Sequence, residues 1–299
     1  MNLKIKEWHW EITRKCNLLC KHCISDCNMS CDEELSIQEI VKAVKAMKIL
    51  GCERIMITGG EPLCFKGFWK LLEECKKQDI AVNFLTNGVL INHKLVKRLI
   101  GLVASIGISI DGSTSEINDS IRGVGSFKKS IQALEMLREY FPVSVFFTVS
   151  ALNINDLEES ISLFKSLGIE TIHISEINMW GRALRNSNQL SIANKKEYLR
   201  GMAIKSTKNS KPEEDCTADF SSLYISYDGF VYPCSEIAFC QPDYNLGKIT
   251  SSRFKNGLKQ KIRSCPSGYL LTCCYQIFSG GGLIYYLNKD SGCSFLERR

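Results

Sequence analysis

The run Thr13-Arg-Lys-Cys-Asn-Leu-Leu-Cys-Lys-His-Cys23 is the most informative stretch of this 299-residue chain. It contains Cys16, Cys20 and Cys23 with the spacing C-x3-C-x2-C, directly after a segment in which apolar and polar residues alternate. Three thiolates in one short loop can bind three irons of a cubane iron–sulfur cluster. Because the loop pattern supplies no fourth cysteine, the remaining iron stays open to an exogenous ligand. The loop therefore predicts a cluster that binds a cofactor as well as transferring electrons.

Zinc and disulfide bonds are the two other interpretations of these cysteines. Structural zinc usually takes four ligands from paired knuckles, which this loop lacks, although Cys27 and Cys31 follow closely and can complete a four-ligand site. A disulfide framework is disfavoured, because the chain opens without a charged and then apolar signal segment and its 15 cysteines are unevenly distributed. We therefore expect reduced thiols in a reducing, oxygen-poor cytoplasm.

Short β-rich runs alternate with amphipathic helical segments from residue 8 to about residue 180. We expect strands at Trp8–Thr13, Arg54–Thr58, Ala81–Thr86, Ser105–Asp111, Val143–Ser150 and Thr171–Ile177. We expect the helices between them near Ser36–Leu50, Phe68–Gln78, His93–Leu102, Ser126–Tyr140 and Asp156–Leu167. This alternation predicts an α/β fold with a parallel sheet. Six units are too few for a closed eight-fold barrel, so we predict a partial (β/α)6 TIM-like barrel with ligands at the carboxyl ends of its strands.

Two further motifs lie at the ends of these strands. Ile57-Thr-Gly-Gly-Glu-Pro-Leu63 ends the second strand, and Ile106-Gly-Ile-Ser-Ile-Asp-Gly112 contains the fourth. Together with the cysteine loop, these motifs resemble the radical S-adenosylmethionine (SAM) superfamily, in which the loop holds a 4Fe–4S cluster that binds SAM. By this resemblance the SAM methionine amino group is contacted by Gly59, Gly60 and Glu61, and the ribose or carboxylate lies near Ser109 and Asp111.

The resemblance extends to three more positions. Asn118-Asp-Ser-Ile-Arg122, followed by Gly123 to Phe127, is similar to the HDxxR…GSF stretch of the family, with Asn118 where a histidine is usual. It implies that Arg122 grips the SAM carboxylate, which a guanidinium can bind through two hydrogen bonds. It also implies that Asn153 faces the SAM pocket and that Gly181, in Gly181-Arg182-Ala183, approaches the adenine.

The composition changes beyond residue 183 and suggests three parts. We expect a radical SAM core over 1–183, a polar linker with a helix over 184–215, and an auxiliary iron–sulfur domain over 216–299. The segment 216–299 is short and has little apolar mass for a core, so metal ligation would help to hold it together. The cysteines of this segment are Cys216, Cys234, Cys240, Cys265, Cys273, Cys274 and Cys293.

The C-terminal cysteine spacing resembles the auxiliary-cluster module called SPASM, or its shorter relative Twitch. Cys216-x12-Gly229-x4-Cys234 matches the opening of that module, and Asp228-Gly229 predicts a hairpin turn. The second half departs from it, because Gly268 and Phe278 occupy two expected cysteine positions. By the resemblance we expect one auxiliary cluster, a second if Cys240 or Cys273 substitutes, and zinc as the alternative. The expected ligands are Cys216, Cys234, Cys265, Cys274 and Cys293.

The resemblance implies a radical reaction on a peptide. In this family an electron from the cluster cleaves SAM into methionine and a 5′-deoxyadenosyl radical, which abstracts hydrogen from an unactivated C–H bond. Relatives with this combination of domains often modify ribosomally made peptides, so we expect a thioether or carbon–carbon crosslink in a precursor peptide. The first alternative is peptide epimerisation, with Cys240 or Cys273 as the hydrogen donor. The second is a zinc-stabilised binding module without catalysis.

The charge and composition of the chain limit the kinds of partner that we expect it to bind. The formal net charge of +6 favours an acidic peptide or simply aids solubility. Basic residues are dispersed without an aromatic–basic motif, so we expect no nucleic acid, and we expect no membrane partner. We expect a flavodoxin- or ferredoxin-type reductant. No peptide-recognition domain fits ahead of Trp8, so we expect either direct recognition or a separate leader-binding protein. Ser235 replaces the aspartate of sulfatase-maturing relatives, which disfavours that activity.

Overall fold

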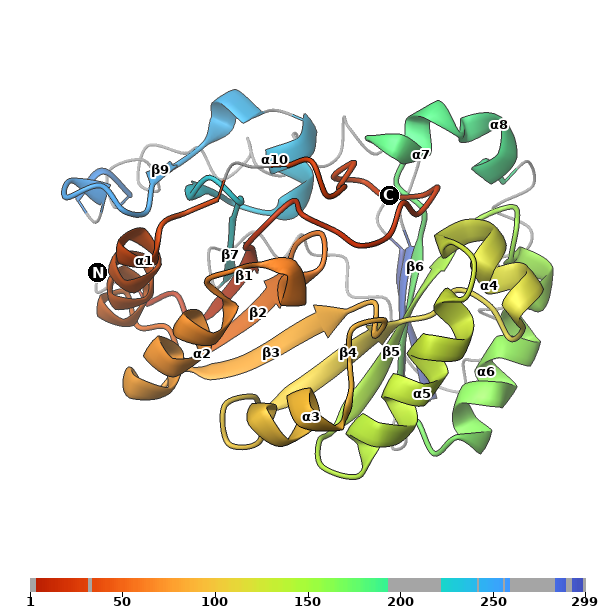
Figure 1. Cartoon of the computed structure of the whole chain (residues 1–299). Coiled ribbons are helices and arrows are strands. Elements are labelled where there is room, and N and C mark those ends of the chain that lie inside the picture. Colours follow the sequence, from red (N-terminus) through yellow and green to blue (C-terminus); the bar gives the residue numbers. More distant parts are fainter. Residues whose placement is uncertain are drawn as a thin grey trace.

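A curved parallel sheet forms the centre of the computed structural model, which describes residues 4–31, 34–192, 222–240, 242–254, 256–258, 283–288 and 292–297. Its six central strands lie side by side in chain order (Figure 1). They are β1 (Glu7–Glu11), β2 (Arg54–Thr58), β3 (Ala81–Thr86), β4 (Ser105–Ser109), β5 (Val143–Val149) and β6 (Thr171–Glu176). Each lies within about two residues of its predicted range, and the partial (β/α) barrel is confirmed.

Helices connect these strands and cover the outer side of the curved sheet (Figure 1). The longer ones are α1 (Ile37–Ile49), α2 (Phe68–Lys77), α3 (His93–Leu99), α4 (Ser115–Arg122), α5 (Ser126–Arg138) and α6 (Leu157–Ser166). Short helices follow at η1 (Pro62–Cys64), η2 (Ile154–Asp156), α7 (Arg182–Arg185) and α8 (Ser187–Leu190). Among the helices in the described part of the chain, none combines the length and apolar character needed to span a membrane.

Local sequence explains where the helices begin. Ser36 caps α1 by accepting a hydrogen bond from the Glu39 backbone, while the Glu39 carboxylate accepts from Ser36, which is a capping box. The helix α4 is not predicted from the sequence. There Thr114 caps the first turn, and only Ile117 and Ile121 supply an apolar pattern, which is too short to be recognised as a helix.

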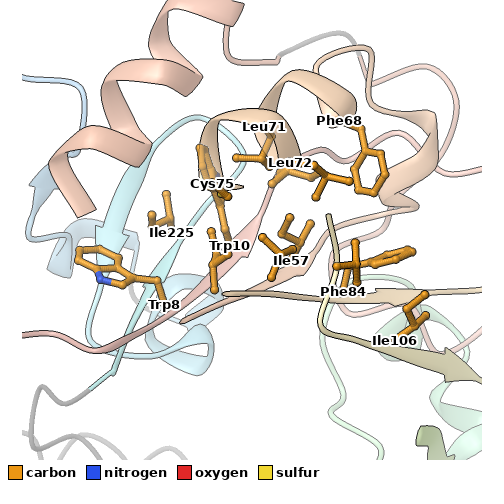
Figure 2. Close-up of a cluster of buried hydrophobic side chains, with 14 of the residues drawn as sticks. Trp8, Trp10, Ile57, Phe68, Leu71, Leu72, Cys75, Phe84, Ile106 and Ile225 are labelled. Carbon is orange, nitrogen blue, oxygen red and sulfur yellow. The ribbon is translucent and has the colours of Figure 1, made fainter. Parts of the chain in front are cut away.

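The core lies between the sheet and the helices. Trp8 and Trp10 on β1 are completely or almost completely buried, and they share one face of the strand because every second residue points to the same side. On the opposite face His9 is exposed and Glu11 is buried, so that face is covered only toward the end of β1. Figure 2 shows Leu71 and Leu72 of α2 close to Ile57 on the neighbouring strand. Other buried side chains of this cluster are Phe68, Cys75, Phe84, Ile106 and Ile225.

The C-terminal part of the chain extends the same sheet at both edges. β7 (Ser222–Ile225) pairs in parallel with β1, and β8 (Phe230–Tyr232) and β9 (Gly247–Lys248) continue from it. At the other edge, β10 (Leu283–Asn288) pairs antiparallel with β6 and then with β11 (Gly292–Glu297). Within the described residues, the sheet thus has 11 strands in the order β11-β10-β6-β5-β4-β3-β2-β1-β7-β8-β9. α10 (Ser235–Cys240) and η3 (Pro242–Tyr244) lie between β8 and β9.

The predicted hairpin is present and contacts the segment that leads into the cysteine loop. β7 and β8 pair antiparallel around the Asp228-Gly229 turn, where Gly229 has a φ of +88°. The Tyr224 hydroxyl donates to the buried Glu11 carboxylate at 3.0 Å, and the Arg14 guanidinium lies 4.2 Å from the centre of the Tyr227 ring. Burial raises the pKa of Glu11, with Arg14 acting in the opposite direction. These contacts join the hairpin to β1.

Replacing Tyr224 with phenylalanine tests this join. The change removes a hydrogen bond from a buried carboxyl, so we expect the free energy of unfolding to fall by about 1–3 kcal/mol. Anaerobic urea denaturation measures this loss. Tyr140→Phe is the control, because Tyr140 is 53% exposed and its hydroxyl can be replaced by water. Equal stabilities of the two variants would show that the Glu11 contact contributes nothing.

Candidate functional site

The carboxyl ends of the central strands border a cavity of about 320 Å³. Cys16, Cys20 and Cys23 all line it. The cavity also brings together four of the other predicted residues, which come from three separate segments: Gly59, Gly60, Ser109 and Arg122. Parallel strands place the residues after their carboxyl ends at one rim, which explains why segments distant in sequence meet here.

The two glycines after β2 allow that segment to pack against the backbone of the cysteine loop. The Gly60 N–H donates to the Thr13 carbonyl at 2.7 Å, and the Glu61 N–H donates to the Lys15 carbonyl at 2.8 Å. A Cβ added at Gly60 would lie 2.3 Å from the Lys15 carbonyl oxygen, and one at Gly59 would lie 2.6 Å from that of Thr13. Any larger residue would push the cysteine loop away from β2.

The Glu61 carboxylate is not part of the cavity lining, but two of the residues that donate hydrogen bonds to it are. It accepts from the Thr86 hydroxyl at 2.8 Å, from the Asn87 N–H at 2.8 Å and from the Leu63 N–H at 3.2 Å. Burial raises its pKa to about 7, although these hydrogen bonds act in the opposite direction. Glu61 thereby joins the end of β2 to the end of β3. Its predicted contact with SAM has no counterpart in the cavity lining of this structure.

Asp111 lies outside the cavity lining and contacts two residues that belong to it. It is fully buried, and its Oδ2 lies 2.6 Å from Arg122 Nε and 3.4 Å from His22 Nε2. Its Oδ1 accepts from the Thr148 N–H at 2.7 Å. Burial lowers the pKa of His22 to about 4, although Asp111 acts in the opposite direction, so this imidazole is neutral at pH 7. Asp111 therefore orients Arg122, which does line the cavity.

The asparagine at position 118 has a structural role. Its side-chain oxygen accepts from the Asp111 N–H at 2.9 Å, and its amide donates to the Ser126 hydroxyl at 2.9 Å. Asn118 therefore joins the end of β4 to the start of α5.

Asn153 and Gly181, both expected at the SAM pocket, do not line the cavity in this structure. The Asn153 amide donates to the carbonyls of Asp111 at 3.0 Å and Thr148 at 2.9 Å, so it joins the ends of β4 and β5. Gly181 packs against the cysteine loop, where an added Cβ would lie 2.2 Å from the Ile24 carbonyl oxygen.

Several cavity residues were not among those selected from the sequence. Asn87 follows β3, lines the cavity, and donates from its amide to Asn17 at 2.8 Å. Glu176 and Asn178 occupy the corresponding place at the end of β6. The common signal is a polar residue directly after a parallel strand. Thr86-Asn87-Gly88, at the end of β3, shows this signal in the sequence.

The donor set fits an iron–sulfur cluster. Every cysteine whose side chain the structure describes is a thiol outside any disulfide. Burial raises the pKa of Cys16 to about 12 and that of Cys20 to about 11, whereas a hydrogen bond with Cys27 lowers that of Cys23 to about 6. Buried thiols of this kind ionise when a metal supplies positive charge. Among the described residues, no three His, Cys, Asp or Glu side chains converge on a single ion. A cubane cluster needs no such convergence, because its irons occupy separate corners.

The predicted auxiliary ligands are described only in part. Cys234 lies two residues after the end of β8 and is half-buried. The backbones of Cys240 and Cys293 lie in α10 and β11. The others lie outside the described residues: Cys216, Cys265, Cys273 and Cys274. The auxiliary ligand set therefore stays a prediction from the sequence.

Glu61 predicts a pH dependence of stability. Its pKa is about 7 in the folded chain against an ordinary value of 4.5, so the folded state binds its proton more tightly than the unfolded state does. Stability from this group is fully present below pH 4.5 and is lost as the pH rises through 7, by on the order of 3 kcal/mol. Urea denaturation across this pH range should show the loss in the native protein and not in Glu61→Gln. The exposed control, Glu135→Gln, should lose as much free energy of unfolding over this pH range as the native protein does. An equal loss in all three proteins would contradict the assignment of the effect to Glu61.

Comparisons with known proteins agree with the geometry. A family model described as the radical SAM superfamily matches residues 10–171, and a second, SPASM, described as an iron–sulfur cluster-binding domain, matches residues 216–264. Mycofactocin maturase MftC of Mycobacterium ulcerans is 32% identical over 176 residues, which cover 58% of this chain and 47% of the relative. The match thus spans about half the length of the mycofactocin maturases. An AdoMet-dependent heme synthase of Oleidesulfovibrio alaskensis is 30% identical over 286 residues. This match covers 82% of this chain and 72% of the heme synthase.

Solved structures share the fold at low sequence identity. SuiB of Streptococcus suis bound to SAM has a TM-score of 0.66 at 16% identity, covering 88% of this chain and 68% of that one. Native anSMEcpe with bound AdoMet has a TM-score of 0.62 at 20% identity, covering 86% and 82%. The family-model match covers more than half of the chain. The chain therefore belongs to the radical SAM superfamily, whose core domain binds a 4Fe–4S cluster and SAM, and it carries a SPASM domain, which binds auxiliary iron–sulfur clusters.

Proposed function

We propose that this enzyme installs a thioether or carbon–carbon crosslink in a ribosomally made precursor peptide. The observation that carries the proposal is the cavity at which three cysteines of one loop meet Gly60 and Arg122. Two relatives support a peptide as substrate. The mycofactocin enzymes are named maturases, and SuiB has been solved in complex with its precursor peptide SuiA.

The cysteine loop and the arginine have distinct roles in this proposal. Cys16, Cys20 and Cys23 hold the cluster, which, when bound, supplies the electron that cleaves SAM. Arg122 binds the SAM carboxylate, because Asp111 holds its guanidinium at the cavity wall. Ser109 contacts the ribose. Leu85 and Phe146 form an apolar part of the wall and exclude water from the reacting groups.

The heme synthase match raises a second candidate substrate, a tetrapyrrole, because it covers most of both chains. The charges of the cavity favour the peptide. Among the described residues, Arg122 is the one lysine or arginine that lines the cavity, and we assign it to the SAM carboxylate, while Glu176 adds a further carboxylate. A tetrapyrrole with several carboxylates would need unpaired cations instead. Peptide N–H groups are suitable donors to a carboxylate such as Glu176.

Crosslinking and epimerisation differ in their hydrogen balance. In crosslinking, the peptide loses one hydrogen atom to the deoxyadenosyl group and a second as a proton plus an electron. We infer that the auxiliary cluster accepts this electron, which gives the SPASM domain a role in the reaction. In epimerisation, Cys240 or Cys273 would return a hydrogen atom and the peptide mass would not change. We further propose that the enzyme works in the cytoplasm with a flavodoxin- or ferredoxin-type reductant, and that the peptide leader is recognised directly or by a separate leader-binding protein.

Mass spectrometry of the peptide product tests the reaction. Reduced, anaerobically reconstituted enzyme is incubated with SAM and the short peptide encoded beside its gene. We expect a loss of about two mass units per event, because a crosslink removes two hydrogen atoms. A gain of about one mass unit in deuterated water without that loss would indicate epimerisation and contradict crosslinking. Conversion of a tetrapyrrole and not of the peptide would contradict the peptide assignment.

Metal analysis tests the cluster ligands separately. Simultaneous replacement of Cys16, Cys20 and Cys23 with alanine removes all three thiolates of the loop. We expect iron and sulfide to fall by about four atoms each per chain relative to the native enzyme, and deoxyadenosine formation to stop. Stoichiometric zinc without sulfide in the anaerobically purified native protein would support the non-catalytic binding module instead.

A further inference from the structure

The segment after β6 packs directly on the cysteine loop. The Arg182 N–H donates to the Cys23 carbonyl at 2.9 Å, and the Asn186 side-chain amide donates to the Lys21 carbonyl at 3.1 Å. Gly181 has a φ of +55°, and an added Cβ would lie within 2.2 Å of the Ile24 carbonyl oxygen. Backbone therefore meets backbone here, at a distance that only glycine permits.

The Arg182 side chain bridges two points of the cysteine loop, the carbonyls of Cys20 and Cys27. Its two terminal nitrogens donate to the Cys20 carbonyl at 3.0 Å and to the Cys27 carbonyl at 2.6 Å. The guanidinium also lies 3.1 Å from the Asp26 carboxylate, and its side chain is only 13% exposed. One rigid planar group thus fixes both ends of the stretch that contains Cys23.

The loop conformation held in this way is intrinsically unfavourable. Asp26 has a φ of +51°, in the left-handed region that residues with a Cβ rarely occupy. Its carboxylate is paired with Arg182 and also with Arg185, whose side chain is 61% exposed. Without the Arg182 hydrogen bonds to the Cys20 and Cys27 carbonyls, the stretch between these residues would relax toward more ordinary backbone angles.

We propose that Arg182 is a positioning residue for the core cluster: it holds the Cys20–Cys27 stretch in the shape that turns Cys20 and Cys23 toward the cavity, and its charge stabilises the reduced cluster. Arg182 does not itself line the cavity, so it positions the cysteines through the loop backbone, and its charge acts on the cluster from outside the lining. Positive charge and hydrogen bonds near a cluster raise its reduction potential, because reduction adds negative charge. An arginine that bridges two carbonyls supplies both effects from one side chain.

Three variants separate geometry from charge. Arg182→Gln removes the charge and the two-carbonyl bridge. Arg182→Lys keeps the charge, but a single ammonium cannot reproduce the planar fork that spans the two carbonyls. Arg185→Gln is the matched control, because it removes an arginine that pairs with the same Asp26 while touching neither cysteine carbonyl.

The readouts are the rate of iron loss to EDTA under anaerobic conditions and the midpoint potential of the core cluster from an EPR-monitored redox titration. The iron loss and the EPR signal of the auxiliary clusters are measured in the variant that lacks Cys16, Cys20 and Cys23, and are then subtracted. Iron loss should accelerate about tenfold or more in Arg182→Gln, as expected for the loss of two charge-assisted hydrogen bonds. Its potential should also become more negative. Arg182→Lys should lose iron faster than the native enzyme while keeping a nearly native potential, and Arg185→Gln should match the native enzyme in both.

Native rates and potential in Arg182→Gln would overturn the proposal, and so would equal effects of Arg182→Gln and Arg185→Gln. If Arg182→Gln does not fold, the iron-loss rate of Arg182→Lys decides, and a native rate would overturn the proposal. Neither readout uses a peptide substrate. A wrong assignment of the substrate would therefore leave this test unaffected.

Discussion

Backbone contacts on two sides of the cysteine loop hold three thiols at one cavity. On one side, the glycines after β2 come so close that Gly60 could not carry a side chain beside the Lys15 carbonyl. On the other side, Gly181 and Arg182 pack on the carbonyls between Cys20 and Cys27. The loop has no regular secondary structure of its own, so its shape depends on these two strand ends.

Burial sets the chemistry of this site. Cys16 and Cys20 lie in surroundings that raise their thiol pKa values, so their thiolates need a positive group beside them. The same interior holds an ion pair between Asp111 and Arg122, and removing either partner would leave an uncompensated buried charge. The ion pair holds the Arg122 guanidinium at the cavity wall, which favours a fixed orientation of SAM.

Much of the fold could be predicted because the relevant signals are local. Strands such as Ala81–Thr86 follow from short apolar runs, and the helices between them follow from apolar spacing. α4 was missed because its pattern is short. The pairing of β7 with β1 and of β10 with β6 joins segments more than 100 residues apart, and no local pattern encodes such contacts. At the site, motifs located the right strand ends, but they did not distinguish Arg122, which lines the cavity, from Asp111 and Asn153, which support it. That distinction depends on side-chain direction and burial.

The most direct test concerns our proposal that the three thiolates of the cysteine loop leave one iron open. Low-temperature EPR spectra of the reduced core cluster are recorded with and without SAM, in a variant in which the SPASM cysteines Cys216 and Cys234 are replaced by serine. If one iron is free to bind SAM, its addition should change the spectrum. A reduced cluster whose spectrum is identical with and without saturating SAM would contradict the account.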